Sequence, residues 1–382
     1  MATSVIRIPI TNTYAGGDYT GTIYVGSQKK PVNVLLDTGS STLAVEESAY
    51  NPTSDPAVQI TDLIQEVSYV DNSGWIGSVV LADICLGQGT GSVTLPKVNT
   101  AVAYSVTKSM FGKYDGILGL AYTKLNDAYV MPGKTFPPNH NYNQVQGARK
   151  TFINPIFTQL EDAGLVANKF AFYTLRSMLS LAQPDVTKDP LNSGFLILGG
   201  GEESTDLYTG TFQNIRVLDD LYYNTNLTSV VVGGGTPIAV PPPTKSSGNA
   251  TNSVIDSGTN SLLLDQNLYN AIAKEMGTAK ARLLSQGQMP IAGFNPSDWP
   301  AIAFIFEGDA GSTVKLVVQP STYWQTNAGE KGLVVAAMRG DNGELQGQSI
   351  LGLPLMNNYF MLFDRSVDQG LGVIKCAAIK NP

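Results

Sequence analysis

Two stretches of this sequence share one pattern, an apolar run that ends in an aspartate and a glycine-containing turn. The first covers residues 31–45 and reads PVNVLLDTGSSTLAV, and the second covers residues 253–264 and reads SVIDSGTNSLLL. Short apolar runs that are not amphipathic predict strands covered on both faces. A solvated surface aspartate does not need such neighbours. The pattern therefore predicts two buried strands, each of which delivers one carboxylate, Asp37 or Asp256, into a turn.

The turns that follow the two aspartates carry groups that can stabilise a carboxylate. Gly39 and Gly258 permit a backbone whose N–H groups point at the carboxyl oxygens. Further donors, or a brace between the turns, come from the neighbouring hydroxyls of Thr38, Ser40, Ser257 and Thr259. Two carboxylates at one site hold one proton between them and titrate at two separated apparent pKa values. Such a pair can take a proton from water and give one to a leaving group.

A second element follows each aspartate at a similar distance. Residues 114–120 read YDGILGL and residues 349–353 read SILGL. With these four elements in order and in two copies, the sequence resembles the pepsin-like aspartic proteases over nearly the whole chain. The resemblance implies that Asp37 and Asp256 are the catalytic pair, and the shared proton is taken over from that family. It also implies that the strands holding Ile117 and Ile350 pass beside the catalytic turns.

The fold that the resemblance implies is all-β with a few short helices and has two lobes related by a pseudo-twofold axis. Residues 1–185 would form the first lobe and residues 186–382 the second, with the two aspartates on the floor of a cleft between them. The length agrees, because 382 residues exceed one ordinary core. So does the composition, since 39 glycines and only 14% charged residues suit a β-rich chain with many turns.

A long hairpin is predicted at residues 66–80, which read EVSYVDNSGWIGSVV. It falls where the family places its flap, and Tyr69 aligns with the flap tyrosine. The tip differs from the usual Tyr-Gly-x-Gly, and Ala44 stands where many pepsins have a tryptophan that bonds this tyrosine. Trp75 is a candidate substitute, and an ordinary cross-strand aromatic is the alternative role for Tyr69. Tyr222 falls at a position that contributes to the substrate cleft in the family.

Other parts of the chain are interpreted as structural. Helices are predicted after Asn154-Pro155, ending at Gly164, and after Asp265, ending at Gly277. An inserted surface loop is predicted at residues 123–150, and irregular stretches at residues 177–193 and 233–252. Such loops either shape the rim of the cleft, recruit a partner or have no function. Asp115 and Asp364 are interpreted as structural rather than catalytic carboxylates.

Composition excludes several classes of function. The net charge of −7 and the absence of an apolar run of transmembrane length argue against nucleic-acid and membrane partners. The single histidine, His140, leaves no His-ligated metal cluster, and no G-x-S-x-G elbow accompanies it. We therefore expect polypeptide substrates, a monomer, no metal and no cofactor. An acidic surface is compatible with work at low pH but does not demonstrate it.

The number of cysteines and the first residues of the chain bear on the cellular compartment of the protein. Cys85 and Cys376 allow one disulfide or two reduced thiols, but not the disulfide framework usual in secreted pepsins. No signal peptide or basic pro-segment is recognised before the strand-like residues 4–10. The protein is then either a trimmed mature form or a bacterial-type homologue that lacks both parts. The cytoplasm is favoured, with a secreted mature form as the alternative.

The predicted function is an aspartic endopeptidase that is active in acid, sensitive to pepstatin and selective for hydrophobic residues beside the scissile bond. The rival hypothesis is a pepsin-fold protein that binds or inhibits without cleaving. In such relatives a catalytic aspartate or its glycine turn has typically changed. Both signatures are intact here, and Ser257 in place of the more frequent threonine is a tolerated variation, so catalysis is predicted.

Overall fold

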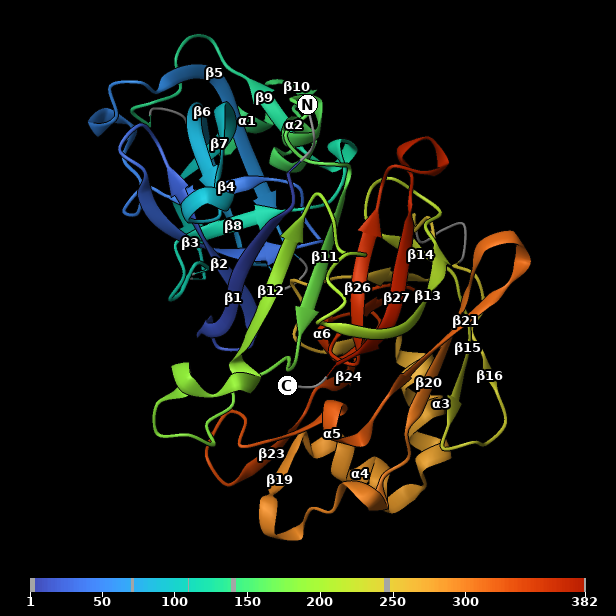
Figure 1. Cartoon of the computed structure of the whole chain (residues 1–382). Helices are drawn as coiled ribbons and strands as arrows, with labels where there is room; N and C mark the ends of the chain where they lie inside the picture. Colours follow the sequence, from blue (N-terminus) through green and yellow to red (C-terminus); the bar gives the residue numbers. More distant parts are fainter. Residues whose placement is uncertain (1–3, 70–71, 109, 139–141, 244–247, 381–382) are drawn as a thin grey trace. The chain divides into compact units, whose positions relative to one another are not determined.

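The structure is a computed structural model that describes residues 4–69, 72–108, 110–138, 142–243 and 248–380 (Figure 1). His140 lies outside these described residues. The chain is mostly β, as predicted from the sequence. It divides into two compact units: unit 1 contains residues 1–8, 20–168 and 197–200, and unit 2 contains residues 9–19, 169–196 and 201–382. The lobe boundary at residue 185 stays a prediction.

Unit 1 is built around one large mixed sheet, in which some neighbouring strands are antiparallel and others parallel. Its strands are β2 (Asp18–Val25), β3 (Lys30–Asp37), β4 (Leu43–Glu46), β5 (Gln59–Ser68), β6 (Gly74–Leu86), β7 (Val93–Thr107), β8 (Gly116–Gly119), β9 (Asp127–Val130) and β10 (Arg149–Phe152). They pair in the order β10-β9-β5-β6-β7-β4-β8-β3-β2, and β6 also pairs with β2. The six strands from β6 to β2 therefore form a closed ring whose interior is filled by buried valine, leucine and isoleucine side chains.

Strands β1 (Ile6–Ala15) and β12 (Ser193–Leu198) contribute residues to both units, and β2 begins in unit 2. Within unit 2, β11 (Lys169–Thr174), β26 (Tyr359–Asp364), β27 (Val373–Ile379) and β13 (Tyr208–Arg216) pair in that order. An aromatic cluster packs on this sheet. The rings of Phe170 and Phe363 stack at 5.0 Å, and Tyr223 meets Phe363 edge-on at 4.6 Å.

Three smaller sheets complete unit 2. The first has the order β14 (Asn224–Thr225), β17 (Ser253–Ile255), β25 (Ser349–Leu351), β18 (Leu262–Leu264) and β24 (Met338–Gly340). The second has the order β16 (Ile238–Ala239), β15 (Leu227–Val232), β20 (Ile302–Glu307) and β21 (Thr313–Val318). The third has the order β19 (Gln288–Pro290), β23 (Leu333–Ala336) and β22 (Trp324–Thr326).

The two predicted helices are confirmed. Helix α2 (Ile156–Asp162) follows Pro155 and buries its apolar stripe, and Gly164 follows its end. Helix α3 (Gln266–Met276) begins at Asp265, whose carboxylate accepts hydrogen bonds from the backbone N–H groups of Asn267 and Leu268. The other α-helices are α1 (Tyr142–Gln146), α4 (Thr278–Gln286), α5 (Pro320–Tyr323) and α6 (Leu353–Met356).

The inserted surface loop predicted at residues 123–150 contains regular secondary structure. This segment contains β9, α1 and the start of β10, and β9 pairs with both β10 and β5. The strands are four residues long, too short to show a period of two in the sequence. The stretch at 177–193 is irregular apart from two short 3₁₀ turns, Val186–Lys188 and Pro190–Asn192. In the third stretch, the described residues include the two-residue strand β16.

Both cysteines are free and buried. Of the two alternatives left open by the sequence, one disulfide or two thiols, the structure has two thiols. Burial raises the pKa of the Cys376 thiol. No helix among the described residues is long and apolar enough to cross a membrane.

Candidate active site

The first predicted carboxylate stands at the end of a buried strand in unit 1. Strand β3 runs parallel to β8, with Leu36 opposite Leu118 and Asp37 opposite Gly119. On the other side of β8, β4 pairs antiparallel, with Ala44 opposite Ile117. After β3 ends at Asp37, the chain turns and returns as β4, which pairs with β8 on the side opposite β3.

Strand β8 ends in Gly119 because the surrounding backbone leaves no room for a side chain. Its N–H donates to the carbonyl of Thr42 over 3.0 Å, so the returning chain lies directly against it. A Cβ at this position would stand 2.5 Å from backbone atoms of Ser41 and Thr42, closer than real side chains approach. Any larger residue would therefore push the turn away from the strand.

The turn after Asp37 supplies two donors to one carboxylate. The backbone N–H of Gly39 donates to Asp37 Oδ1 over 2.7 Å. The Ser40 hydroxyl donates to Asp37 Oδ2 over 2.5 Å. Asp37 and Ser40 are buried, so both bonds act where water screens little, and both favour the ionised carboxylate.

The same arrangement recurs in unit 2. Strand β17 runs parallel to β25, with Val254 opposite Ile350, and β18 pairs antiparallel on the other side of β25. Gly352 follows β25, and its N–H donates to the carbonyl of Ser261 over 3.2 Å. A Cβ on Gly352 would stand 2.0 Å from the carbonyl oxygen of Thr259.

The turn after Asp256 matches the first turn atom for atom. The backbone N–H of Gly258 donates to Asp256 Oδ1 over 2.8 Å, and the Thr259 hydroxyl donates to Asp256 Oδ2 over 2.7 Å. Asp256 is buried as well. In each unit, therefore, one aspartate carboxylate accepts a hydrogen bond from the backbone N–H two residues later and another from the hydroxyl three residues later. The donors predicted from the sequence at Gly39, Ser40, Gly258 and Thr259 are confirmed.

The predicted hairpin forms in unit 1 from β5 and β6, with Ser68 opposite Gly74. Burial raises the pKa of the Tyr69 hydroxyl, and the negative charge of Asp37 adds to the rise. Interactions with Trp75 and Ser40 oppose it, which places the phenol near both residues. Trp75 Nε1 is buried and has no regular hydrogen-bond partner among the described residues.

The remaining predicted residues have different degrees of exposure. Ile117 is buried between Leu35 and Ala44 in the sheet, whereas Ile350 and Tyr222 are half-buried. Thr38 and Ser257 are buried in their turns. Their roles in binding or support stay predictions.

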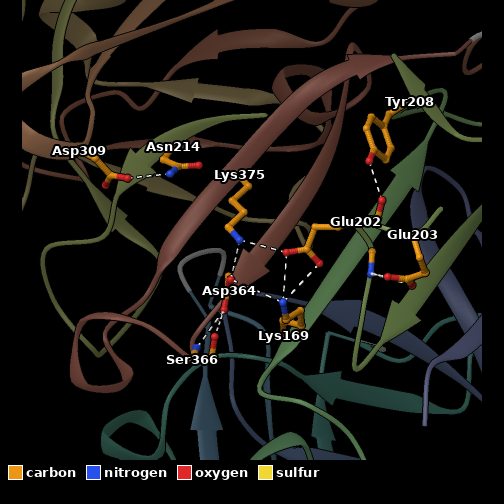
Figure 2. Close-up of polar contacts among 10 residues, drawn as sticks. Lys169, Glu202, Glu203, Tyr208, Asn214, Asp309, Asp364, Ser366 and Lys375 are labelled. Atoms are coloured by element: carbon orange, nitrogen blue, oxygen red, sulfur yellow. Dashed lines mark hydrogen bonds and ion pairs between the residues drawn. The ribbon is translucent and has the colours of Figure 1, made fainter. Parts of the chain in front are cut away.

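Asp115 and Asp364 are structural carboxylates, as predicted. Asp115 accepts a hydrogen bond from the backbone N–H of Asn33 over 2.7 Å, which anchors the start of β8 to β3. Asp364 belongs to a charge cluster formed with Lys169, Glu202 and Lys375 (Figure 2). Lys375 Nζ lies 2.7 Å from Asp364 Oδ2 and 3.0 Å from Glu202 Oε1.

Sequence reasoning missed one polar group close to the first turn. Thr42 and Gln65 both donate to Asn126 Oδ1 over 2.8 Å, and all three side chains are buried. Amide and hydroxyl side chains in loops carry no spacing signal, and Asn126 is far from Gln65 in the sequence. In the described part of the chain, no group of three or more His, Cys, Asp or Glu side chains could hold a metal ion.

Comparison with known proteins identifies the family. A family model for the eukaryotic aspartyl proteases matches residues 18–373. The chain belongs to this family. The match includes both aspartate turns and both glycine-ended strands, so the aspartyl-protease resemblance inferred from the sequence is confirmed.

Individual aspartyl proteases are similar over most of their length. Pepsin A of Sus scrofa is 26% identical over 380 residues, covering 94% of this chain and 81% of the relative. Gastricsin of Callithrix jacchus is 23% identical over 369 residues, covering 92% and 80%. Pepsin A of Suncus murinus is 26% identical over 386 residues, covering 95% and 82%.

Proposed function

We propose that the protein is an aspartic endopeptidase in which Asp37 and Asp256 act as one catalytic pair. The observation that carries the proposal is the match between the two aspartate turns. In each, a backbone N–H and a hydroxyl donate to the two oxygens of one buried carboxylate. Membership of the aspartyl protease family supports the same assignment.

The pair would hold a single proton, because two adjacent carboxylates cannot both ionise at low cost. The ionised aspartate takes a proton from a water molecule, whose oxygen attacks the scissile carbonyl carbon. The protonated aspartate donates to the carbonyl oxygen and so stabilises the negative charge that develops there. The aspartate that took the water proton then gives it to the amide nitrogen, and the C–N bond breaks as one hydroxyl of the tetrahedral intermediate returns its proton to the other aspartate, so that the carboxyl and amine products leave. One chain contains both turns, so we propose that a monomer suffices.

The other predicted residues take roles around this pair. Thr38 and Ser257, with their glycine and hydroxyl neighbours, support the two turns. The hairpin tipped by Tyr69, with Trp75, closes over an extended polypeptide and excludes water. Tyr222 and Ile350, which are half-buried, contact the substrate directly, and Ile117, which is buried, backs the strand beside the first turn; these apolar side chains favour hydrophobic residues on either side of the scissile bond.

Activity is proposed to be confined to acid. The mechanism needs one protonated carboxylate as the general acid, and this acid is lost when both carboxylates are ionised.

The test replaces each aspartate by asparagine and measures peptide cleavage. Asp37→Asn and Asp256→Asn each remove an ionisable group but keep the shape, so kcat is expected to fall by about a hundredfold to ten-thousandfold. Asp298→Asn, at an exposed position of unit 2, is the matched control and should cleave like the parent. Folding of each variant is checked by circular dichroism. Undiminished cleavage by folded Asp256→Asn would falsify the mechanism.

A further inference from the structure

The segment between β8 and α2 is attached to the hairpin that the proposed function assigns to substrate. Strand β9 pairs with β5, with Leu63 opposite Val130 and Ile64 opposite Tyr129, and β10 pairs with β9 on its other side. The first strand of the hairpin therefore has neighbours along both edges, β6 on one side and β9 on the other (Figure 1).

A small apolar core fastens this segment to both strands of the hairpin. Ile64 from β5 packs with Met131 and Val145, and all three are buried. Ile76 from β6 packs against the same cluster. The contact therefore reaches across the hairpin rather than touching only its outer edge.

Backbone bonds continue the attachment beyond β9. The N–H of Met131 donates to the carbonyl of Asp62 over 2.7 Å, and the Thr135 hydroxyl donates to the carbonyl of Leu63 over 3.1 Å. The Ser78 hydroxyl, on β6, donates to the carbonyl of Thr135 over 2.6 Å. Each of these bonds lies on the side of the hairpin away from its tip.

Asn126 joins the base of this segment to the hairpin and to the first aspartate turn. Its Oδ1 accepts hydrogen bonds from Thr42 Oγ1 and from Gln65 Nε2, both over 2.8 Å. Its Nδ2 donates to the carbonyl of Ile153 over 2.9 Å, and its own carbonyl accepts from the N–H of Ile153. We call Thr42, Gln65 and Asn126 the amide hub.

The amide hub is joined to the first aspartate turn through Thr42. Thr42 follows Asp37 in the same turn, and its carbonyl accepts the N–H of Gly119 over 3.0 Å. Gln65 stands on β5 ahead of Tyr69. A buried, satisfied polar network of this kind holds its members in one arrangement, because any shift leaves a buried donor or acceptor unpaired.

We propose that Asn126 is a positioning residue that fixes the base of the hairpin to the aspartate turn, so that only the part beyond Gln65 moves when a polypeptide binds. This inference rests on the proposed function for its effect on cleavage. A fixed base lowers the entropy that the hairpin loses when it closes over substrate. Loss of the amide hub should therefore weaken substrate binding more than it slows the bond-breaking step.

The principal variant is Gln65→Met, which keeps the bulk of the side chain and removes the donor to Asn126 Oδ1, together with the bond from the same amide to the carbonyl of Asp127 over 2.9 Å. We expect KM for an extended peptide to rise about tenfold while kcat changes less than about threefold. A merely structural role would lower the fraction of active protein, so that kcat falls and KM stays constant. That second outcome overturns the proposal.

Two further variants test the assignment of the donors. Thr42→Val removes the other hydrogen bond to Asn126 and should raise KM in the same way, whereas Thr42→Ser keeps the hydroxyl and should restore the parent KM. Gln146→Met is the matched control, because Gln146 bonds Glu66 on the same hairpin at an exposed site. It should leave KM unchanged, and a rise equal to that of Gln65→Met overturns the role of the amide hub.

Hydrogen exchange provides a readout that needs no catalysis. In Gln65→Met, amides of β5 should exchange at least about tenfold faster than in the parent, while those of β27 in unit 2 stay unchanged. Equal acceleration of both strands, or none in β5, overturns the proposal. If the parent chain cleaves nothing, the proposed function fails, and the exchange result still decides whether the amide hub fixes the hairpin.

Discussion

Ser40 Oγ donates a hydrogen bond to Asp37 Oδ2 over 2.5 Å, and both side chains are buried. Thr259 Oγ1 makes the same bond to Asp256 Oδ2 over 2.7 Å. In each turn the other carboxyl oxygen accepts a backbone N–H from glycine. Each unit therefore orients its own carboxylate through two donors that belong to the fold.

The first prediction concerns these hydroxyls. Ser40→Ala removes one donor to a buried carboxylate, and a hydrogen bond to a charged group contributes about 1.5–3 kcal/mol. We expect kcat/KM for peptide cleavage to fall about tenfold to about a hundredfold. Ser40→Thr keeps a hydroxyl at this position, as Thr259 does in unit 2, and should retain most of the activity. Equal activity of the alanine and threonine variants would contradict this role.

The second prediction concerns the glycine at the end of β8. Gly119→Ala places a Cβ 2.5 Å from the backbone of Ser41 and Thr42, and relief of this overlap must displace the turn. We expect a loss of at least about 1–3 kcal/mol of stability, seen as a lower midpoint in urea unfolding. Gly91→Ala is the control, because a Cβ there meets open space. The prediction is wrong if both variants unfold at the same urea concentration.

The third prediction concerns the charge cluster of unit 2. Burial alone would raise the pKa of Asp364, but hydrogen bonds from Lys375 and Ser366 outweigh it and hold this pKa below the usual 3.8. The pKa of Glu202 is lowered in the same way below 4.5 by Lys375 and Lys169. These carboxylates therefore stabilise the fold fully at pH values above their usual, unfolded-state pKa. They lose this stabilising effect as the pH falls through their lowered, folded-state pKa.

The melting temperature of the parent should therefore fall steeply below about pH 4. Asp364→Asn should melt lower than the parent at pH 7, and the difference should shrink as the pH falls below 3.8. Asp298→Asn is the control and should follow the parent at every pH. A constant difference between Asp364→Asn and the parent from pH 7 to pH 2.5 would show that the cluster does not carry the acid sensitivity.

The fourth prediction concerns Tyr69 and Trp75. The pKa of Tyr69 is raised, so its hydroxyl stays protonated across the acid and neutral range and remains a donor. Because the phenol of Tyr69 interacts with Trp75, Tyr69→Phe and Trp75→Phe should each lower kcat/KM by about two- to threefold, the low end of the effect of one neutral hydrogen bond. The double variant should lose no more than either single one. Losses that multiply would mean that the two side chains act independently.

The two aspartate turns and two helices could be predicted from the sequence because their signals are local. Asp265 and Gly277 lie at the ends of one helix, and Asp256 and Gly258 lie within one turn. The pairing of each turn with a glycine-ended strand was also predictable, because the same pattern occurs twice in the chain.

The segment that includes β9 and β10 could not be predicted in this way. Its strands are short, and β9 gains its stability from pairing with β5, a strand far away in the sequence. The same is true of Asn126, whose partners Thr42 and Gln65 come from two other elements. Such contacts are decided by the tertiary fold, and an amide in a loop gives no sign of them.

The catalytic pair itself is tested most directly by cleavage of an unfolded protein substrate from about pH 3 to pH 7, with and without pepstatin. The shared-proton mechanism predicts activity that is confined to acid and abolished by this dyad-directed inhibitor. Protein that is demonstrably folded and cleaves nothing at any pH would contradict catalysis and favour a binding role. Cleavage that persists at pH 7 in the presence of pepstatin would contradict the assignment to Asp37 and Asp256.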